Sequence, residues 1–108
     1  AGLTFSVHVG TTITSNNFII AGKTSADTFQ GQLVSNDFTD LGSLTLLNEN
    51  VATVAFDQPA VADYRITMSG TTTGGKLGSY VNCTAISAII WNIDGFLSSD
   101  GSLATTFS

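Results

Sequence analysis

Apolar and polar residues alternate at the start of the chain. Apolar side chains occupy the odd positions from Leu3 to Val9, and the polar residues Thr4, Ser6 and His8 occupy the even positions between them. A period of two places successive side chains on opposite faces of an extended chain. The pattern therefore predicts a half-buried strand over Leu3–Val9.

Short apolar runs recur along the rest of the chain, separated by groups of Gly, Asn, Asp and Ser that tolerate the positive φ of tight turns. These runs predict strands around Ile13 and over Phe18–Ala21, Phe29–Val34, Leu44–Leu47, Val51–Phe56, Tyr64–Met68, Tyr80–Ile90 and Leu103–Phe107. About eight short strands joined by such turns are typical of an all-β domain. We expect a single-domain antiparallel β-sandwich, jelly-roll or immunoglobulin-like, over residues 1–108.

One segment fits two structures. Ala85–Trp91 could form a helix, with Thr84 as its cap and Asp94-Gly95 at its end. Four isoleucines between positions 86 and 93 favour a strand, because β-branched side chains suit extended backbone. We interpret the segment as a buried central strand, with the helix as the alternative, and expect Asn92–Gly101 to form the loop that follows.

Charge is scarce along the whole chain. Asp, Glu, Lys and Arg together make up 10% of the residues, against about 25% in an average domain. Hydroxyl and amide side chains must therefore cover most of the surface, and little electrostatic repulsion separates copies of the protein. Such a surface favours contact with other copies of the chain or with neutral ligands.

The sign of the charge excludes some partners. The net charge is −5, and the only cations are Lys23, Arg65 and Lys76, far apart along the chain. Nucleic acids and anionic membranes are bound by clustered Lys and Arg, so we expect contact with neither. No apolar run approaches the roughly 18 residues that a membrane-spanning helix needs, so we expect no membrane insertion.

Catalytic motifs are weak. Gly70–Lys76 fits G-x-x-x-x-G-K, but Leu77 stands where a phosphate-binding loop needs Ser or Thr, so we expect a β-hairpin loop. Any Ser-His-Asp triad would have to use His8, the only histidine, and a lone His leaves a metal short of ligands. The single cysteine, Cys83, allows no internal disulfide and no thiolate metal site. We expect His8 on a polar strand face, Cys83 in the core, and an enzymatic activity, catalytic residues, metal and cofactors to be absent.

Acidic residues leave two questions open. The carboxylate pairs Asp37/Asp40, Asp57/Asp63 and Asp94/Asp100 lie among turn residues, where Asp commonly makes local hydrogen bonds. We therefore expect them to be structural rather than a glycosidase pair. The oxygen-rich segment 92–101 lacks the EF-hand spacing, and Ca²⁺ binding there remains open.

Two functions fit this surface. The first is a self-assembling structural protein, such as a virion coat, decoration or tail component or a fibre subunit, located outside the cell, on its surface or in a virion. It would form a homo-oligomer through uncharged strand edges at Leu3, Phe5, Val7, Leu103 and Phe107. The alternative is a small lectin that binds glycans through Asn92, Asp94 and Asp100.

Overall fold

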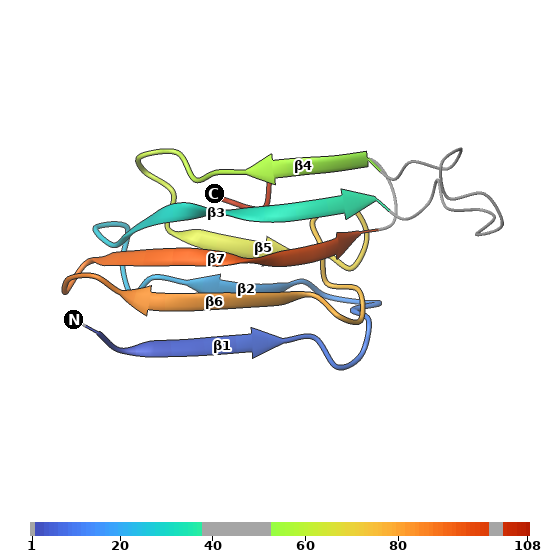
Figure 1. The fold of residues 1–108 in the computed structure, drawn as a ribbon, viewed down its shortest axis with the longest axis horizontal. Helices are drawn as coiled ribbons and strands as arrows, with labels where there is room; N and C mark the ends of the chain where they lie inside the picture. The colour runs from blue at the N-terminus through green and yellow to red at the C-terminus, as the bar shows by residue number, and fades with distance from the viewer. Residues whose placement is uncertain (1, 38–52, 100–102) are drawn as a thin grey trace, which may run out of the picture.

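The computed structural model describes residues 2–37, 53–99 and 103–108, and every regular element in these ranges is a strand (Figure 1). The predicted all-β class is confirmed. None of these residues forms a helix, and so none forms one long and apolar enough to cross a membrane. The strands are β1 (Thr4–His8), β2 (Phe18–Ala21), β3 (Thr28–Asp37), β4 (Thr53–Asp57), β5 (Arg65–Met68), β6 (Tyr80–Ala85) and β7 (Ile90–Ser99).

The strands form two sheets. Five lie in the order β1-β6-β7-β3-β4, and β2 pairs with β5 in a separate sheet. Most neighbours are antiparallel, but β3 and β7 run parallel over ten residues each, so the prediction of a purely antiparallel arrangement was wrong. The reason is the connection: β4, β5 and β6 lie between β3 and β7 in the chain, which provides the long crossover that parallel neighbours need.

The register gives the five-stranded sheet two distinct faces. Its paired positions place every odd-numbered strand residue on one face and every even-numbered residue on the other. The odd face holds the fully buried side chains of Leu33, Val81, Ile93 and Leu97. This alternation confirms the face assignment predicted for the first strand.

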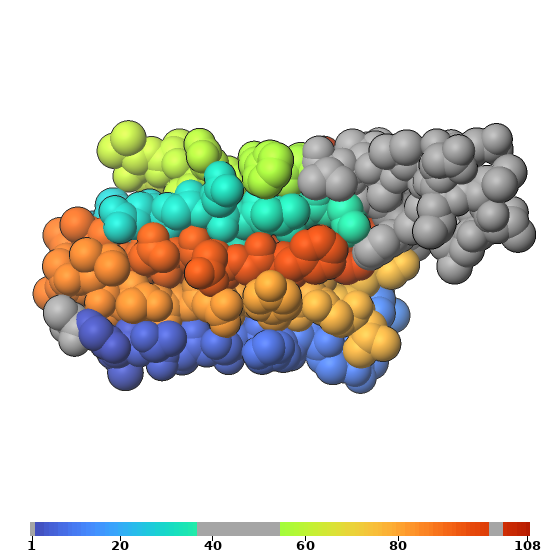
Figure 2. Space-filling view, viewed as in Figure 1, coloured from blue at the N-terminus to red at the C-terminus, as the bar shows by residue number. Residues whose placement is uncertain are grey.

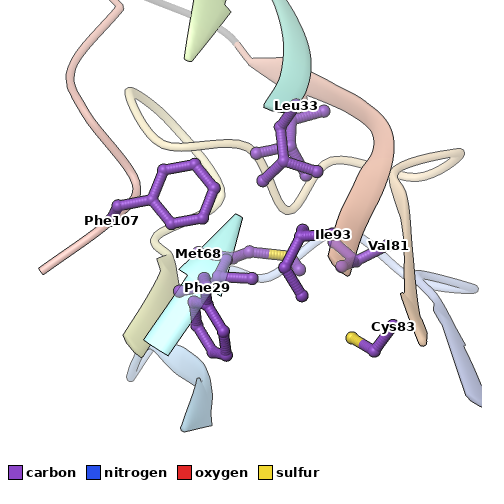
Figure 3. Close-up of a cluster of buried hydrophobic side chains, with 9 residues drawn as sticks. Phe29, Leu33, Met68, Val81, Cys83, Ile93 and Phe107 are labelled. Atoms are coloured by element: carbon purple, nitrogen blue, oxygen red, sulfur yellow. The ribbon is translucent and has the colours of Figure 1, made fainter. Parts of the chain in front are cut away.

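The second sheet packs against the odd face. Ile66 and Met68 of β5 are fully buried in one cluster with Leu33 and Ile93, and Phe29 meets Phe107 edge to face with ring centroids 6.3 Å apart (Figure 3). Figure 1 shows β2 and β5 behind β6, β7 and β3. The core therefore lies between the two sheets and away from β1.

The C-terminal segment closes the layers on the side of β4. Phe107 bridges Ile66 beside β5, and the carbonyl of Ser108 accepts hydrogen bonds from the backbone N–H groups of Tyr64 and Arg65. The Asp57 carboxylate at the end of β4 accepts bonds of 2.7 Å from both the backbone N–H and the hydroxyl of Thr106. Of the strand predicted over Leu103–Phe107, the structure contains a single bridge at Phe107.

The segment Ala85–Trp91 is neither one strand nor a helix. β6 ends at Ala85, residues 86–89 turn, and β7 begins at Ile90, with the Ile86 N–H donating to the Ile90 carbonyl across the hairpin. The Ser87 hydroxyl accepts a hydrogen bond from the Ile89 N–H and so stabilises the turn. The prediction of a continuous buried strand was wrong because a run of isoleucines does not reveal a turn that local hydroxyl bonding supports.

Two further strand predictions differ from the structure. Residues 92–99, expected in a loop, belong to β7. Asp94 is exposed there, whereas Ser98 and Ser99 are buried, and the Ser99 hydroxyl accepts a hydrogen bond from the Gly74 N–H. Ile13 lies outside the strands and donates its N–H to the Gly75 carbonyl. The predicted strand Leu44–Leu47 lies outside the described residues.

Gly31 allows the close approach of β3 and β7. It has a φ of +100°, and a Cβ built on it would lie 2.1 Å from the carbonyl oxygen of Ile93, its register partner. Any side chain at this position would therefore carry backbone strain and also push the two parallel strands apart.

Substitution of Gly31 separates these two costs. Both Gly31→Ala and Gly78→Ala introduce a side chain at positive φ, but a Cβ at Gly78 meets no atom within 4 Å. We expect Gly31→Ala to lower the free energy of unfolding by at least about 2 kcal/mol more than Gly78→Ala, since positive-φ strain alone costs about 1–3 kcal/mol. Urea unfolding of both variants measures the difference, and equal losses would contradict the close approach.

Candidate functional site

The side of the molecule between β1 and β2, which we call the open side, is incompletely covered. β1 is the last strand of its sheet, and none of the described strands lies behind it in Figure 1. Its core-facing residue Phe5 consequently remains 42% exposed, although it packs edge to face on Trp91 at 5.6 Å between ring centroids. On β2, Phe18 remains 44% exposed. The apolar interior thus reaches solvent here.

Two hollows lie along the open side. One of about 240 Å³ is lined mainly by apolar residues, among them Phe5, Ile20, Phe29 and Trp91, and also by Lys23 and Asp27 between β2 and β3. The other, of about 200 Å³, lies between Val7 and Phe18. Both are smaller than the roughly 300–1,000 Å³ of typical small-molecule sites, so each is better suited to a side chain than to a cofactor.

The free backbone edge of β1 borders the same side. The Leu3 carbonyl accepts from the Ala85 N–H, and the Val9 N–H donates to the Ser79 carbonyl, so backbone groups at odd positions point toward β6. Bonding alternates along an antiparallel strand, which directs the N–H and C=O groups of Thr4, Ser6 and His8 outward. This edge can therefore accept another strand.

The second candidate surface is the even-numbered face of the five-stranded sheet, which we call the outer face. Figure 2 shows it, with β1, β6, β7, β3 and β4 side by side and no part of β2 or β5 over them. The register aligns one polar row across these strands, continued past the end of β4 by a glutamine. The row consists of Ser6, Asn82, Asp94, Gln32 and Gln58.

An aromatic row runs beside the polar row. The register places His8, Tyr80 and Phe96 next to one another, and Val34 and Phe56 continue the line across β3 and β4. The His8 and Tyr80 rings stack at 5.7 Å between centroids, and Phe56 is 67% exposed. Amide and aromatic groups therefore lie in parallel lines on one face.

The structure separates the residues predicted for self-association. Phe5 and Val7 lie on β1 at the open side, and Leu3 directly precedes that strand. Phe107, by contrast, is buried in the core of its own chain, and Leu103 is half-buried beside β4. Phe107 is thus used within the chain, as its bridge to Ile66 shows.

The residues predicted for glycan binding are placed in part. Asn92 and Asp94 lie on the outer face of β7, and Asp100 lies outside the described residues. Sequence reasoning overlooked the neighbours that the register adds, namely Asn82, Gln32 and Gln58. Polar residues at every second position within the predicted strands were the available signal.

The histidine, the cysteine and the glycine-rich loop that could have served catalysis occupy positions typical of structural residues. His8 lies on the polar face of β1, as predicted, and Cys83 is buried in the core, as predicted. The loop from Gly70 to Lys76 closes on itself through a bond from the Gly70 N–H to the Gly74 carbonyl, and no helix follows it in the described residues. A phosphate-binding loop would need such a helix.

Two of these carboxylates, Asp57 and Asp63, make structural hydrogen bonds within the chain. Asp57 holds the C-terminal segment, and Asp63 accepts a hydrogen bond of 2.9 Å from the Ala60 N–H within its turn. Residues 2–37, 53–99 and 103–108 contain no group of three or more His, Cys, Asp or Glu side chains that could hold a metal ion. The candidate sites in these residues are therefore the open side, with the free edge of β1, and the outer face.

Comparisons with protein-family models, with curated proteins and with solved structures find no match to this chain. Functional interpretation consequently depends on the open side and the outer face themselves.

Cys83 gives a test of the core beside the open side. Burial, and secondarily the nearby Asp94 carboxylate, raises the pKa of its thiol from 9.0 to about 11. The folded state thus favours the neutral thiol, and this contribution is complete below pH 9 and is lost as pH rises toward 11. We expect the free energy of unfolding to fall by about 2 kcal/mol more in the wild type than in Cys83→Ala between pH 8 and 11. Urea unfolding at both pH values measures this, and parallel pH profiles would contradict it.

Proposed function

We propose that the chain is a non-enzymatic structural subunit, an incomplete β-sandwich that forms homo-oligomers through its open side. The observation that carries the proposal is the uncovered apolar margin of the layers, where Phe5 and Phe18 border two hollows. Such an assembly suits an extracellular, cell-surface or virion setting.

The chemistry of the open side supports a protein partner. Apolar side chains gather on the margin, and Leu3, at the entry to β1, is 65% exposed. Fully burying a leucine or phenylalanine side chain contributes about 1.5–3 kcal/mol. An association that buries several of these side chains therefore gains this free energy several times over.

A second copy of the chain suits the edge better than an unrelated partner. β1 consists of Thr4–His8 and contains no Asp, Glu, Lys or Arg. Natural edge strands are commonly protected by lysines, prolines or bulges, and β1 has neither lysine nor proline. Two copies meet without like-charge repulsion across such an edge.

The outward backbone groups define the pairing. A two-fold axis through Ser6 would join two copies of β1 antiparallel, with Thr4 opposite His8 of the second copy. On the core side, Phe5 would then lie opposite Val7 of the second copy, beside the hollow that Val7 lines. The same strand on both subunits makes this contact self-complementary and closed.

Pairing of two β1 strands alone buries too little surface for a stable dimer. Five residues of β1 extend about 17 Å, and strand pairing alone buries less than the roughly 800 Å² per partner of a stable interface. The apolar margin around Leu3, Phe5 and Phe18 must contribute the remainder. Substitution on this margin should therefore weaken association strongly.

A charge at Leu3 tests the assembly. We expect the wild type to form dimers or larger species at micromolar concentration, and Leu3→Glu to raise the dissociation constant about 100-fold, or about 2.7 kcal/mol. The reason is that each interface would bury two unpaired carboxylates. Size-exclusion chromatography with light scattering over a concentration series measures the effect.

Val61→Glu is the matched control. Val61 is 92% exposed and lies between β4 and β5, away from the open side, and it receives the same change of charge. We expect its association to equal that of the wild type. A monomeric wild type, or equal weakening by both substitutions, would overturn the proposal.

A cysteine at Ser6 tests the register. Directly opposed, hydrogen-bonded residues of antiparallel strands lie about 5.5 Å apart between Cα atoms, within the 4.4–6.8 Å range of disulfides. In a Cys83→Ala background, Ser6→Cys should therefore form a covalent dimer on oxidation, whereas Thr4→Cys should not, because its two copies would lie about 14 Å apart. Non-reducing gel electrophoresis distinguishes them, and equal cross-linking would exclude an axis at Ser6.

A further inference from the structure

We infer that the outer face binds a neutral polysaccharide chain along its paired polar and aromatic rows. This site differs from the open side and goes beyond assembly. It uses the even-numbered residues of the five-stranded sheet, whose side chains lie on the face away from the core. It includes Asp94, which the register brings between the amides of Asn82 and Gln32, whereas Asn92 lies on the same face outside both rows.

The polar row offers hydrogen-bonding groups that the protein itself does not use. Asn82 accepts a bond of 2.6 Å from the Ser6 hydroxyl through Oδ1, and Gln32 accepts from Gln58 Nε2 at 3.2 Å through Oε1. Within the described part of the chain, the side-chain amide NH2 groups of Asn82 and Gln32 have no protein acceptor. These groups can donate to hydroxyl oxygens of a bound ligand.

The polar row is also long enough for a chain-like ligand. Adjacent strands lie about 4.7–4.9 Å apart, so a row across five strands extends about 19 Å. A ligand that engages the whole row must therefore be extended and must repeat its hydrogen-bonding groups. A sugar polymer has both properties.

The aromatic row supplies the apolar half of the site. It lies about 7 Å from the polar row, which is the separation of alternate residues along a strand. Tyr80, stacked on His8, presents a ring at the surface, and Phe56 is largely exposed. A sugar ring has apolar C–H faces and hydroxyls at its rim, and so it can contact both rows together.

The charge of the face selects a neutral ligand. Among the strand residues of the outer face, Asp94 is the only carboxylate, and there is no Lys or Arg. Anionic polysaccharides and phosphate-bearing ligands would meet Asp94 without a strand cation to offset it. The occupant that fits is an uncharged glycan.

Native affinity electrophoresis tests the inference with soluble neutral β-glucan, xylan, mannan and dextran in separate gels, and with an anionic polysaccharide for contrast. We expect at least one neutral polymer to retard the wild type and the Leu3→Glu variant alike. Tyr80→Ala and the exposed-site change Gln32→Ala should each weaken retardation at least tenfold. Tyr64→Ala, which removes an aromatic ring that stacks with Arg65 away from the outer face, should leave it unchanged.

The outcomes separate this inference from the assembly proposal. Retardation of Leu3→Glu supports a glycan site even where that variant is monomeric, and an assembling wild type that no neutral polymer retards overturns the site alone. Retardation by the anionic polymer only, or equal loss in Tyr80→Ala and Tyr64→Ala, overturns it as well. Because Gln32 is exposed, its variant keeps the test decisive should Tyr80→Ala fail to fold.

Discussion

The central constraint on this structure is that a two-stranded sheet has to cover the apolar face of a five-stranded one. β2 and β5 bury the middle of that face through Ile66 and Met68, and the C-terminal segment with Phe107 covers the side of β4. Nothing equivalent covers β1 among the described residues. The exposed Phe5 and the two hollows are consequences of this unequal coverage, and the free strand edge follows from the terminal position of β1 in its sheet.

The same sheet separates two kinds of surface by the alternation of its side chains. Odd positions contribute the core and, at β1, the apolar margin, whereas even positions contribute the amides and aromatic rings of the outer face. The two proposals therefore use different side chains of the same strands. A substitution such as Leu3→Glu changes one surface and leaves the other intact.

Local sequence patterns predicted the positions of several strands, but they did not predict which strands pair with one another. The alternation at Leu3–Val9 and the run at Phe18–Ala21 identified their strands because each is a property of adjacent residues. The parallel pairing of β3 with β7 depends on positions far apart in the chain, and it requires Gly31 to have no side chain. Asn82 and Gln32 could not be recognised as one row without the register, since each alone is an ordinary polar strand residue.

The position of β1 also affects how the chain acquires its fold. Thr4 meets Thr84, a partner 80 residues later, so β1 has no neighbour until those further residues have been synthesised. At about 5–20 residues per second of synthesis, the wait lasts roughly 4 to 16 seconds, and contacts of such sequence separation form slowly in any case. During that time both edges of an uncharged strand are open, and two nascent copies can join before either has folded. Timing as well as affinity would then determine whether copies join as finished subunits or become entangled.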